Sequence, residues 1–193
     1  GIDELPAERA LGVYWNVEID SLGFKTDNHM FEDKPKTRRG LLSVVSAVYD
    51  PLGLASPFIM RARMMLQELT RLKMGWDIEL PSEFKRVWGI WLQDLEMLTN
   101  FQVPRCVKKS DPESSLELHY FTDASEKGFG LVVYVRQVGK KGNVLTCSLL
   151  LSKSHVALLK SISIPRLELC ASVLAVKTNM FLKRVLDLPI NNI

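Results

Sequence analysis

The chain has 193 residues, 47% of them hydrophobic and 24% charged, a normal balance for a globular protein of one large or two small domains. Its three cysteines, Cys106, Cys147 and Cys170, fit neither a disulfide framework nor a zinc pattern, so we expect a reducing compartment. No apolar run approaches the roughly 20 residues that cross a bilayer, and no signal peptide is visible, so we expect an intracellular protein (cytoplasmic or nuclear) without a membrane partner. The net charge of +3 is compatible with a polyanion partner but is not evidence for one.

The N-terminal region begins with a predicted hairpin and a basic connector. Residues 10–27 are rich in β-formers around a turn cluster at residues 20–23. The densest positive run follows, and it could contact nucleic-acid phosphates or be a solvated loop with about equal probability. The cations of this connector are Lys34, Lys36, Arg38 and Arg39.

Three helices are predicted next. Thr37 can cap the first, which ends at residues 50–53, and Ser56 begins the second, which Gly75 can close. Ser82 begins the third, whose apolar stripe is the cleanest in the chain and includes Trp88 and Trp91. We expect these two tryptophans to pack in the core rather than to stack on bases.

The pattern changes to strands after a linker at residues 111–115. Strands are predicted at residues 116–123, 129–136 and 144–151, and a helix from Ser163 to about residue 185. We therefore expect an α/β (α+β) chain in two parts. Residues 1–110 form a hairpin and a helical region, and residues 111–193 form a three-strand antiparallel meander followed by one helix.

Two carboxylates stand out in the second part. Asp123 lies at the end of a predicted strand, next to small residues that allow close approach of a ligand, and could bind a hard cation; from spacing alone, a turn cap is the better interpretation. Glu168 is expected in the first turn of the last helix, beside its buried face, where the helix macrodipole alone could account for it.

Together the two carboxylates on a β-β-β-α unit resemble the ribonuclease H fold. Phe121-Thr122-Asp123-Ala124-Ser125 is similar to the first-strand signature of that family, and Leu167-Glu168-Leu169-Cys170-Ala171 to its first-helix signature. The resemblance implies that Asp123 and Glu168 are catalytic residues and ligands of a two-metal Mg²⁺ site that cleaves phosphodiesters. The next acid of the family lies on the strand after this helix, so we expect an incomplete site and little activity from these residues alone.

A more specific resemblance covers nearly the whole chain. Six motifs occur in the order seen in the polyprotein of BEL/Pao-type LTR retrotransposons, where the end of reverse transcriptase joins the start of ribonuclease H. The resemblance implies an RNA–DNA hybrid or nucleic-acid backbone as partner, together with the remainder of the Pol polyprotein, and we expect a piece without polymerase activity. The motifs are residues 9–16, 39–43, 49–54, 75–77, 121–125 and 164–169.

Two other functions stay open. One is a domesticated or decayed remnant that binds nucleic acid or has a structural role without catalysis. The other is an aspartic peptidase, because this family region has been labelled a Pao retrotransposon peptidase and Asp123-Ala124-Ser125 faintly resembles Asp-Thr/Ser-Gly. Ser125 replaces the glycine of that motif, and no second copy supplies the partner aspartate that such enzymes need.

Overall fold

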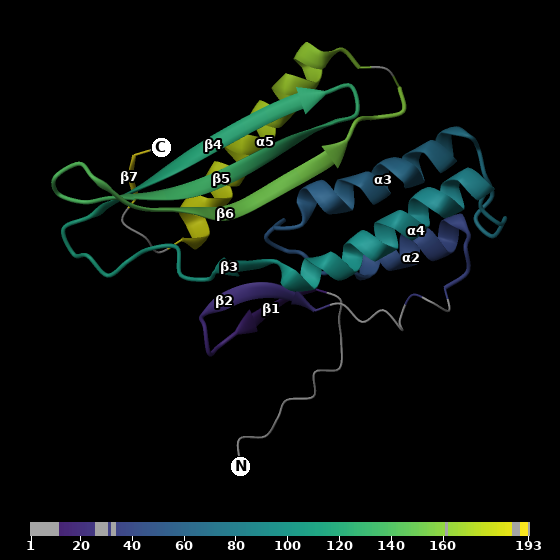
Figure 1. Ribbon diagram of the computed structural model, residues 1–193. Coiled ribbons are helices and arrows are strands. Elements are labelled where there is room, and N and C mark those ends of the chain that lie inside the picture. The colour runs from purple at the N-terminus through teal and green to yellow at the C-terminus, as the bar shows by residue number, and fades with distance from the viewer. Residues whose placement is uncertain (1–11, 26–30, 32–33, 161, 187–189, 193) are drawn as a thin grey trace. The chain divides into compact units, whose positions relative to one another are not determined.

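The chain folds into two units, shown in the computed structural model of Figure 1. The structure describes residues 12–25, 31, 34–160, 162–186 and 190–192. The first unit comprises residues 1–51 and 61–105, and the second comprises residues 52–60 and 106–193. The second unit therefore includes residues 52–60, which we predicted from the sequence to belong to the first part, residues 1–110.

The predicted N-terminal hairpin is present and gains a third strand. β1 (Gly12–Asn16) pairs with β2 (Ser21–Lys25), and β2 pairs with β3 (Gln102–Pro104), all antiparallel. β3 was not predicted, because three residues carry too little periodicity to indicate a strand.

The first two helices begin where their caps indicate. α2 (Arg38–Ala47) starts after Thr37, whose hydroxyl accepts a hydrogen bond from the Gly40 amide at 3.2 Å. α3 (Ser56–Arg71) also starts as predicted, but its end does not involve Gly75. The helix ends at Arg71. Lys73, two positions later, has a φ of 54° and is the left-handed residue that terminates the helix.

The third helix confirms the expected role of the tryptophan pair. α4 (Ser82–Met97) buries Trp88, Trp91 and Leu95, and a 3₁₀ turn, η1 (Leu98–Asn100), follows it. The rings of Trp88 and Trp91 stack with their centroids 4.9 Å apart. Both tryptophans are thus core residues and do not offer a surface on which nucleic-acid bases could stack.

The second unit is built on a four-stranded sheet. β4 (Ser115–Ser125), β5 (Gly128–Val138) and β6 (Val144–Val156) form the predicted antiparallel meander. A fourth strand, β7 (Ile190–Asn192), was not predicted and lies parallel to β4, which gives the order β6-β5-β4-β7.

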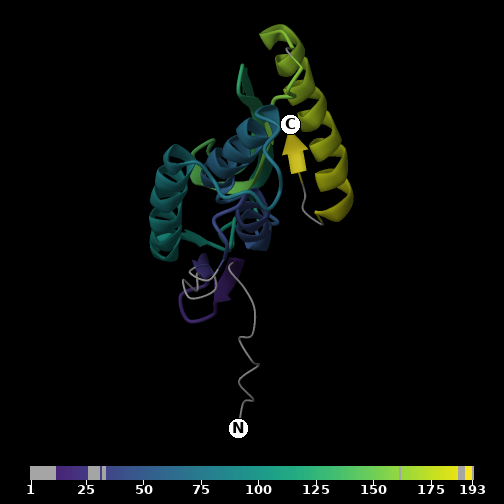
Figure 2. The ribbon, with the colours of Figure 1, turned by 90° about the vertical axis from the view of Figure 1, so that its right-hand side faces the viewer.

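Helix α5 (Ile164–Val185) packs on β4 and β5 and completes the core of this unit (Figures 1 and 2). Its buried residues are Leu167, Ala171, Thr178 and Leu182. Leu182 belongs to one apolar cluster with Leu116 and Leu118 of β4 and Val133 of β5. The even-numbered residues of β4 therefore face α5, because successive side chains of a strand alternate between its two faces.

Residues 52–60 are fixed to the opposite edge strand of the sheet. The Ser152 amide of β6 donates to the Leu52 carbonyl at 2.8 Å, and the Ser152 hydroxyl donates to the Gly53 carbonyl at 2.5 Å. Gly53 has a φ of 71°, and a Cβ on it would lie 2.0 Å from the Ser152 carbonyl oxygen. The tight approach of these two backbones explains why the motif at residues 49–54 contains a glycine.

Candidate metal and nucleic-acid site

Asp123 is presented by a regular part of β4. The strand pairs with β5 along its whole length, and Asp123 lies opposite Gly130. The side chain is exposed, and its Oδ1 atom accepts a hydrogen bond from the Ala124 amide at 2.8 Å. The turn that follows is held instead by Ser125, whose hydroxyl donates to the Gly128 carbonyl and accepts from the Lys127 amide. Asp123 is therefore not the cap of this turn.

Glu168 lies just past the first turn of α5, which corrects the expectation that it belongs to that turn. The first turn of this helix contains no acidic residue. The macrodipole acts mainly within the terminal turn, so it is a weaker explanation for Glu168 than the sequence suggested. Leu167 points into the core, and the neighbouring Glu168 is exposed.

The two carboxylates lie at the same end of the sheet. β4 and α5 run antiparallel, and the Tyr120 hydroxyl donates to Asn179 Oδ1 at 3.0 Å, which fixes one point of contact between them. From that contact, Asp123 is about 10 Å further along the strand and Glu168 about 16 Å back along the helix. Their backbones are thus offset along the sheet by only about 6 Å on these rises.

Asp123 and Glu168 lie on opposite faces of the sheet. Tyr120 faces α5, so alternation directs the Asp123 Cβ to the other face of the sheet. A shared ion would therefore lie at the margin of the sheet, where the strand ends, rather than between sheet and helix. Within the described part of the chain, no third His, Cys, Asp or Glu joins them in a group that could hold a metal ion.

The donor set nevertheless suits magnesium. Mg²⁺ prefers oxygen ligands and is often held by one or two carboxylates, with waters and substrate phosphates completing its shell. Asp123 and Glu168 offer carboxylate oxygens that are open to solvent, so they could serve as such a partial set.

One of the four cations of the predicted basic connector, Arg38, is engaged in holding the first unit together. Arg38 donates to the Met74 carbonyl at 3.0 Å and to Thr70 Oγ1 at 2.8 Å, and its guanidinium lies 3.9 Å from the centroid of the Trp76 ring. The Arg38 side chain thus fastens the start of α2 to the end of α3 and the loop beyond it. Its partner contacts leave little freedom to bind a phosphate.

Arg39, Lys34 and Lys36 remain accessible. Arg39 forms a two-pronged ion pair with Asp77, at 2.6 and 2.9 Å, and this pairing lowers the pKa of the Asp77 carboxyl. Both side chains of that pair are exposed, so a phosphate could compete for Arg39. Lys34 and Lys36 are exposed as well. Sequence reasoning missed that Trp76 and Asp77, in the motif at residues 75–77, are the partners of Arg38 and Arg39.

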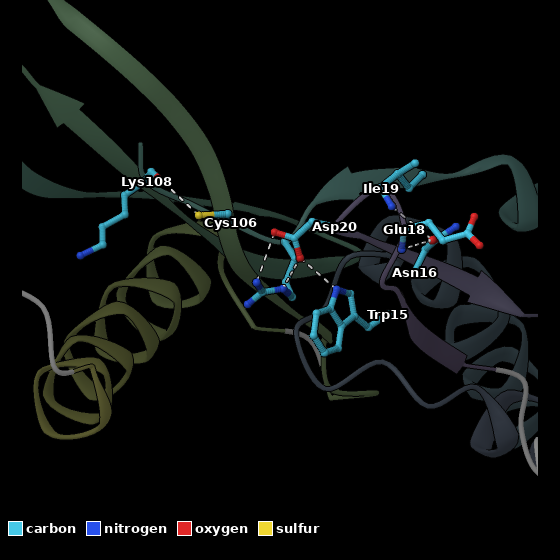
Figure 3. Close-up of polar contacts among 8 residues, drawn as sticks. Trp15, Asn16, Glu18, Ile19, Asp20, Cys106 and Lys108 are labelled. Atoms are coloured by element: carbon cyan, nitrogen blue, oxygen red, sulfur yellow. Dashed lines mark hydrogen bonds and ion pairs between the residues drawn. The ribbon is translucent and has the colours of Figure 1, made fainter. Parts of the chain in front are cut away.

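A second polar cluster, also missed from the sequence, closes the N-terminal hairpin (Figure 3). Asp20 has a φ of 46°, accepts a hydrogen bond from Trp15 Nε1 at 2.9 Å and pairs with Arg105 at 2.6 and 3.2 Å. The Arg105 guanidinium also lies 4.8 Å from the centroid of the Trp15 ring. The hydrogen bond from Arg105 lowers the pKa of the Asp20 carboxyl. Asn16 Oδ1 accepts from the Glu18 and Ile19 amides and shapes the same turn.

The sheet order, the helix packed on β4 and β5 and the two acidic signatures define a ribonuclease H-like domain. Residues 37–193 match the family described as the Pao retrotransposon-like RNaseH-like domain, and the chain belongs to this family. It is therefore a region of a Pao-type retrotransposon polyprotein, as the sequence resemblance implied. No curated protein matches the chain. Of the helices that the structure describes, none has the length and apolar character needed to cross a membrane.

Proposed function

We propose that this region handles RNA–DNA hybrids within the retrotransposon polyprotein and contributes Asp123 and Glu168 to a two-metal ribonuclease H site. The observation that carries the proposal is the placement of two exposed carboxylates, from β4 and α5, at one end of a sheet of ribonuclease H-like order. When bound, Mg²⁺ ions would supply the charge that activates a water and stabilises the leaving oxygen of a phosphodiester.

We expect the residues of this chain to hold part of that site in position without supplying all of its metal ligands. Asp123 is held by a strand paired over its full length, and Glu168 by a long helix that is anchored by Leu167. The Tyr120–Asn179 hydrogen bond fixes α5 against β4. This contact lies further from that end of the sheet than Asp123 and Glu168 do. We expect Lys34, Lys36 and Arg39 to contact the phosphate backbone without reading its sequence.

The test uses the polypeptide extended by its natural downstream sequence, with Mg²⁺ and an RNA–DNA hybrid as substrate. We expect Asp123→Asn and Glu168→Gln each to reduce cleavage more than about 100-fold, because even outer-shell partners of metal ligands are worth roughly 10–100-fold. Glu126→Gln is the matched control, since Glu126 is an exposed acid in the turn directly after β4 and should leave cleavage unchanged. Full cleavage by the Asp123→Asn variant would show that the metal assignment is wrong.

A binding module without catalysis is the second candidate. It is favoured by the observation that the described residues contain no group of three or more His, Cys, Asp or Glu side chains that could hold a metal ion. This candidate predicts hybrid affinity that survives both Asp123→Asn and Glu168→Gln and falls as salt rises. An affinity independent of salt concentration would exclude phosphate contacts by Lys34, Lys36 and Arg39.

A further inference from the structure

The second unit is assembled from two separate stretches of the chain, residues 52–60 and 106–193. The chain therefore passes between the units after residues 51, 60 and 105. The passage after residue 60 lies inside α3, so one continuous helix begins in the second unit and ends in the first. The passage after residue 105 lies in a segment, residues 105–114, that contains neither helix nor strand. We call this segment the crossover, and a cut there breaks the chain without breaking an element.

The crossover is accessible, and each of its ends is anchored on its own unit. On one side, Arg105 pairs with Asp20 through its side chain, and its amide donates to the Asp20 carbonyl at 3.0 Å. On the other side, the buried Gln137 side chain binds the backbone amide and carbonyl of Lys109, at 2.7 and 2.9 Å. Lys108, between these anchors, is exposed. Exposed irregular segments are preferred sites of proteolysis, so the crossover is open to a protease.

Residues 52–60 are attached first at the edge of the sheet. Ser152 of β6 directs its backbone to this segment, because its amide donates to the Leu52 carbonyl at 2.8 Å and its carbonyl oxygen lies 2.0 Å from the place of a Cβ on Gly53. The amide and carbonyl of one strand residue point to the same side, so Ser152 makes no ladder bond to β5. Its hydroxyl also donates to the Gly53 carbonyl.

The second attachment lies on a face of the sheet. Leu131 of β5 belongs to the core under α5, so Gly128, three positions earlier, faces the other side. A Cβ on Gly128 would lie 2.2 Å from Met60 Cε, which shows that the Met60 side chain packs directly on this glycine. The Ser154 hydroxyl of β6 donates to the Ser56 carbonyl at 3.5 Å. The segment is thus held by two strands, at the edge and on the face away from α5.

We propose that residues 52–60 are a docking segment that keeps the polypeptide joined when a protease cuts the crossover. A cut after residue 105 leaves residues 1–105 and 106–193 as separate pieces, and the first piece carries the docking segment bound to the sheet of the second. Proteolysis at this position therefore nicks the polyprotein region without releasing its ribonuclease H-like unit. The inference is independent of the proposed metal site, because it uses neither Asp123 nor Glu168.

The test inserts a site-specific protease sequence between Arg105 and Cys106 of the full chain, cuts it, and compares denaturing electrophoresis with size-exclusion chromatography. We expect two pieces on the denaturing gel and one species on the column. The Ser152 amide should stay protected from hydrogen exchange in the cut protein, because its partner, the Leu52 carbonyl, remains bound.

Ser152→Pro is the variant that weakens the docking segment. It removes the amide and the hydroxyl that bind residues 52 and 53 but no bond to β5, and proline is tolerated at such outward positions of an edge strand. We expect the two pieces to bind each other roughly 5- to 150-fold more weakly, as the loss of two hydrogen bonds implies. Gly142→Ala, in the loop between β5 and β6, is the control that should leave their affinity unchanged.

Two kinds of result overturn the proposal. Separation of the wild-type pieces on the column would show that residues 52–60 do not hold the nicked protein together. A single species whose Ser152 amide exchanges freely, or whose affinity Ser152→Pro leaves unchanged, would assign the association to other contacts. The exchange measurement uses the wild-type sequence around β6, so it decides the matter also when Ser152→Pro fails to fold.

Discussion

Replacing Gly53 with alanine tests the contact that joins residues 52–60 to β6. Alanine at a φ of 71° costs about 1–2 kcal/mol through its Cβ alone. That Cβ would also lie 2.0 Å from the Ser152 carbonyl oxygen, so the two backbones must separate. Separation breaks the two hydrogen bonds of Ser152 with residues 52 and 53, worth roughly 0.5–1.5 kcal/mol each. We expect Gly53→Ala to lower the unfolding free energy of the second unit by about 2–5 kcal/mol.

Gly142→Ala is the matched control in the same unit. Gly142 has a φ of 77° in the loop between β5 and β6, and a Cβ on it would meet nothing within 4 Å. It should therefore cost only the backbone term, about 1–2 kcal/mol. The difference between the two variants measures the contact between residues 52–53 and β6, without the cost of the left-handed backbone.

The assay must follow the second unit by itself. All four tryptophans, Trp15, Trp76, Trp88 and Trp91, belong to the first unit, so their fluorescence does not report the change. Urea denaturation monitored by hydrogen exchange of the β6 amides reports the stability of the second unit. Tryptophan fluorescence then serves as an internal reference for the first unit. Equal losses for Gly53→Ala and Gly142→Ala would refute the reasoning that the close approach to Ser152 stabilises the unit.

Two further predictions concern arginines of the first unit. Arg38→Ala should destabilise the first unit by about 2–4 kcal/mol in urea titrations monitored by tryptophan fluorescence, because it removes two hydrogen bonds and a contact with Trp76. Arg39→Ala should destabilise it much less, because the ion pair of Arg39 with Asp77 is exposed to solvent. Asp20 has a pKa below its ordinary value of 3.8 because Arg105 donates to it, so its contribution to stability is present above that pH and is lost as the pH falls below it. Arg105→Gln should flatten this acid limb of the stability curve, and an unchanged limb would show that the pair does not stabilise the hairpin.

Local signals predicted most of the helices and strands. The threonine before α2, Ser-Pro at the start of α3 and the serine before α5 marked helix starts correctly. Thr37 makes a side-chain hydrogen bond to the first turn of its helix, whereas Ser163 makes none. The strands missed were β3 and β7, which have three residues each and exist only through pairing with β2 and β4. Pairing between distant segments leaves no pattern inside so short a segment.

The sequence named the candidate site residues Asp123 and Glu168, and their role as metal ligands stays a prediction. The surroundings of the predicted basic connector could not be predicted. The engagement of Arg38 with Thr70 and Trp76 could not be seen, because it depends on how α2 packs against the end of α3. A run of cations in the sequence therefore overstates the charge that is free for a phosphate.

The pairing register of the short strand β7 with β4 predicts which residue of a longer polypeptide would lie beside Asp123. Asn192 pairs with Glu117 in a parallel register, and Asp123 follows Glu117 by six positions. In a polypeptide that continues this strand without a further bulge, the position beside Asp123 falls about six residues after Asn192, since parallel strands advance at the same rise. The genomic sequence downstream can thus be checked for a carboxylate at one specified place, before any protein is made.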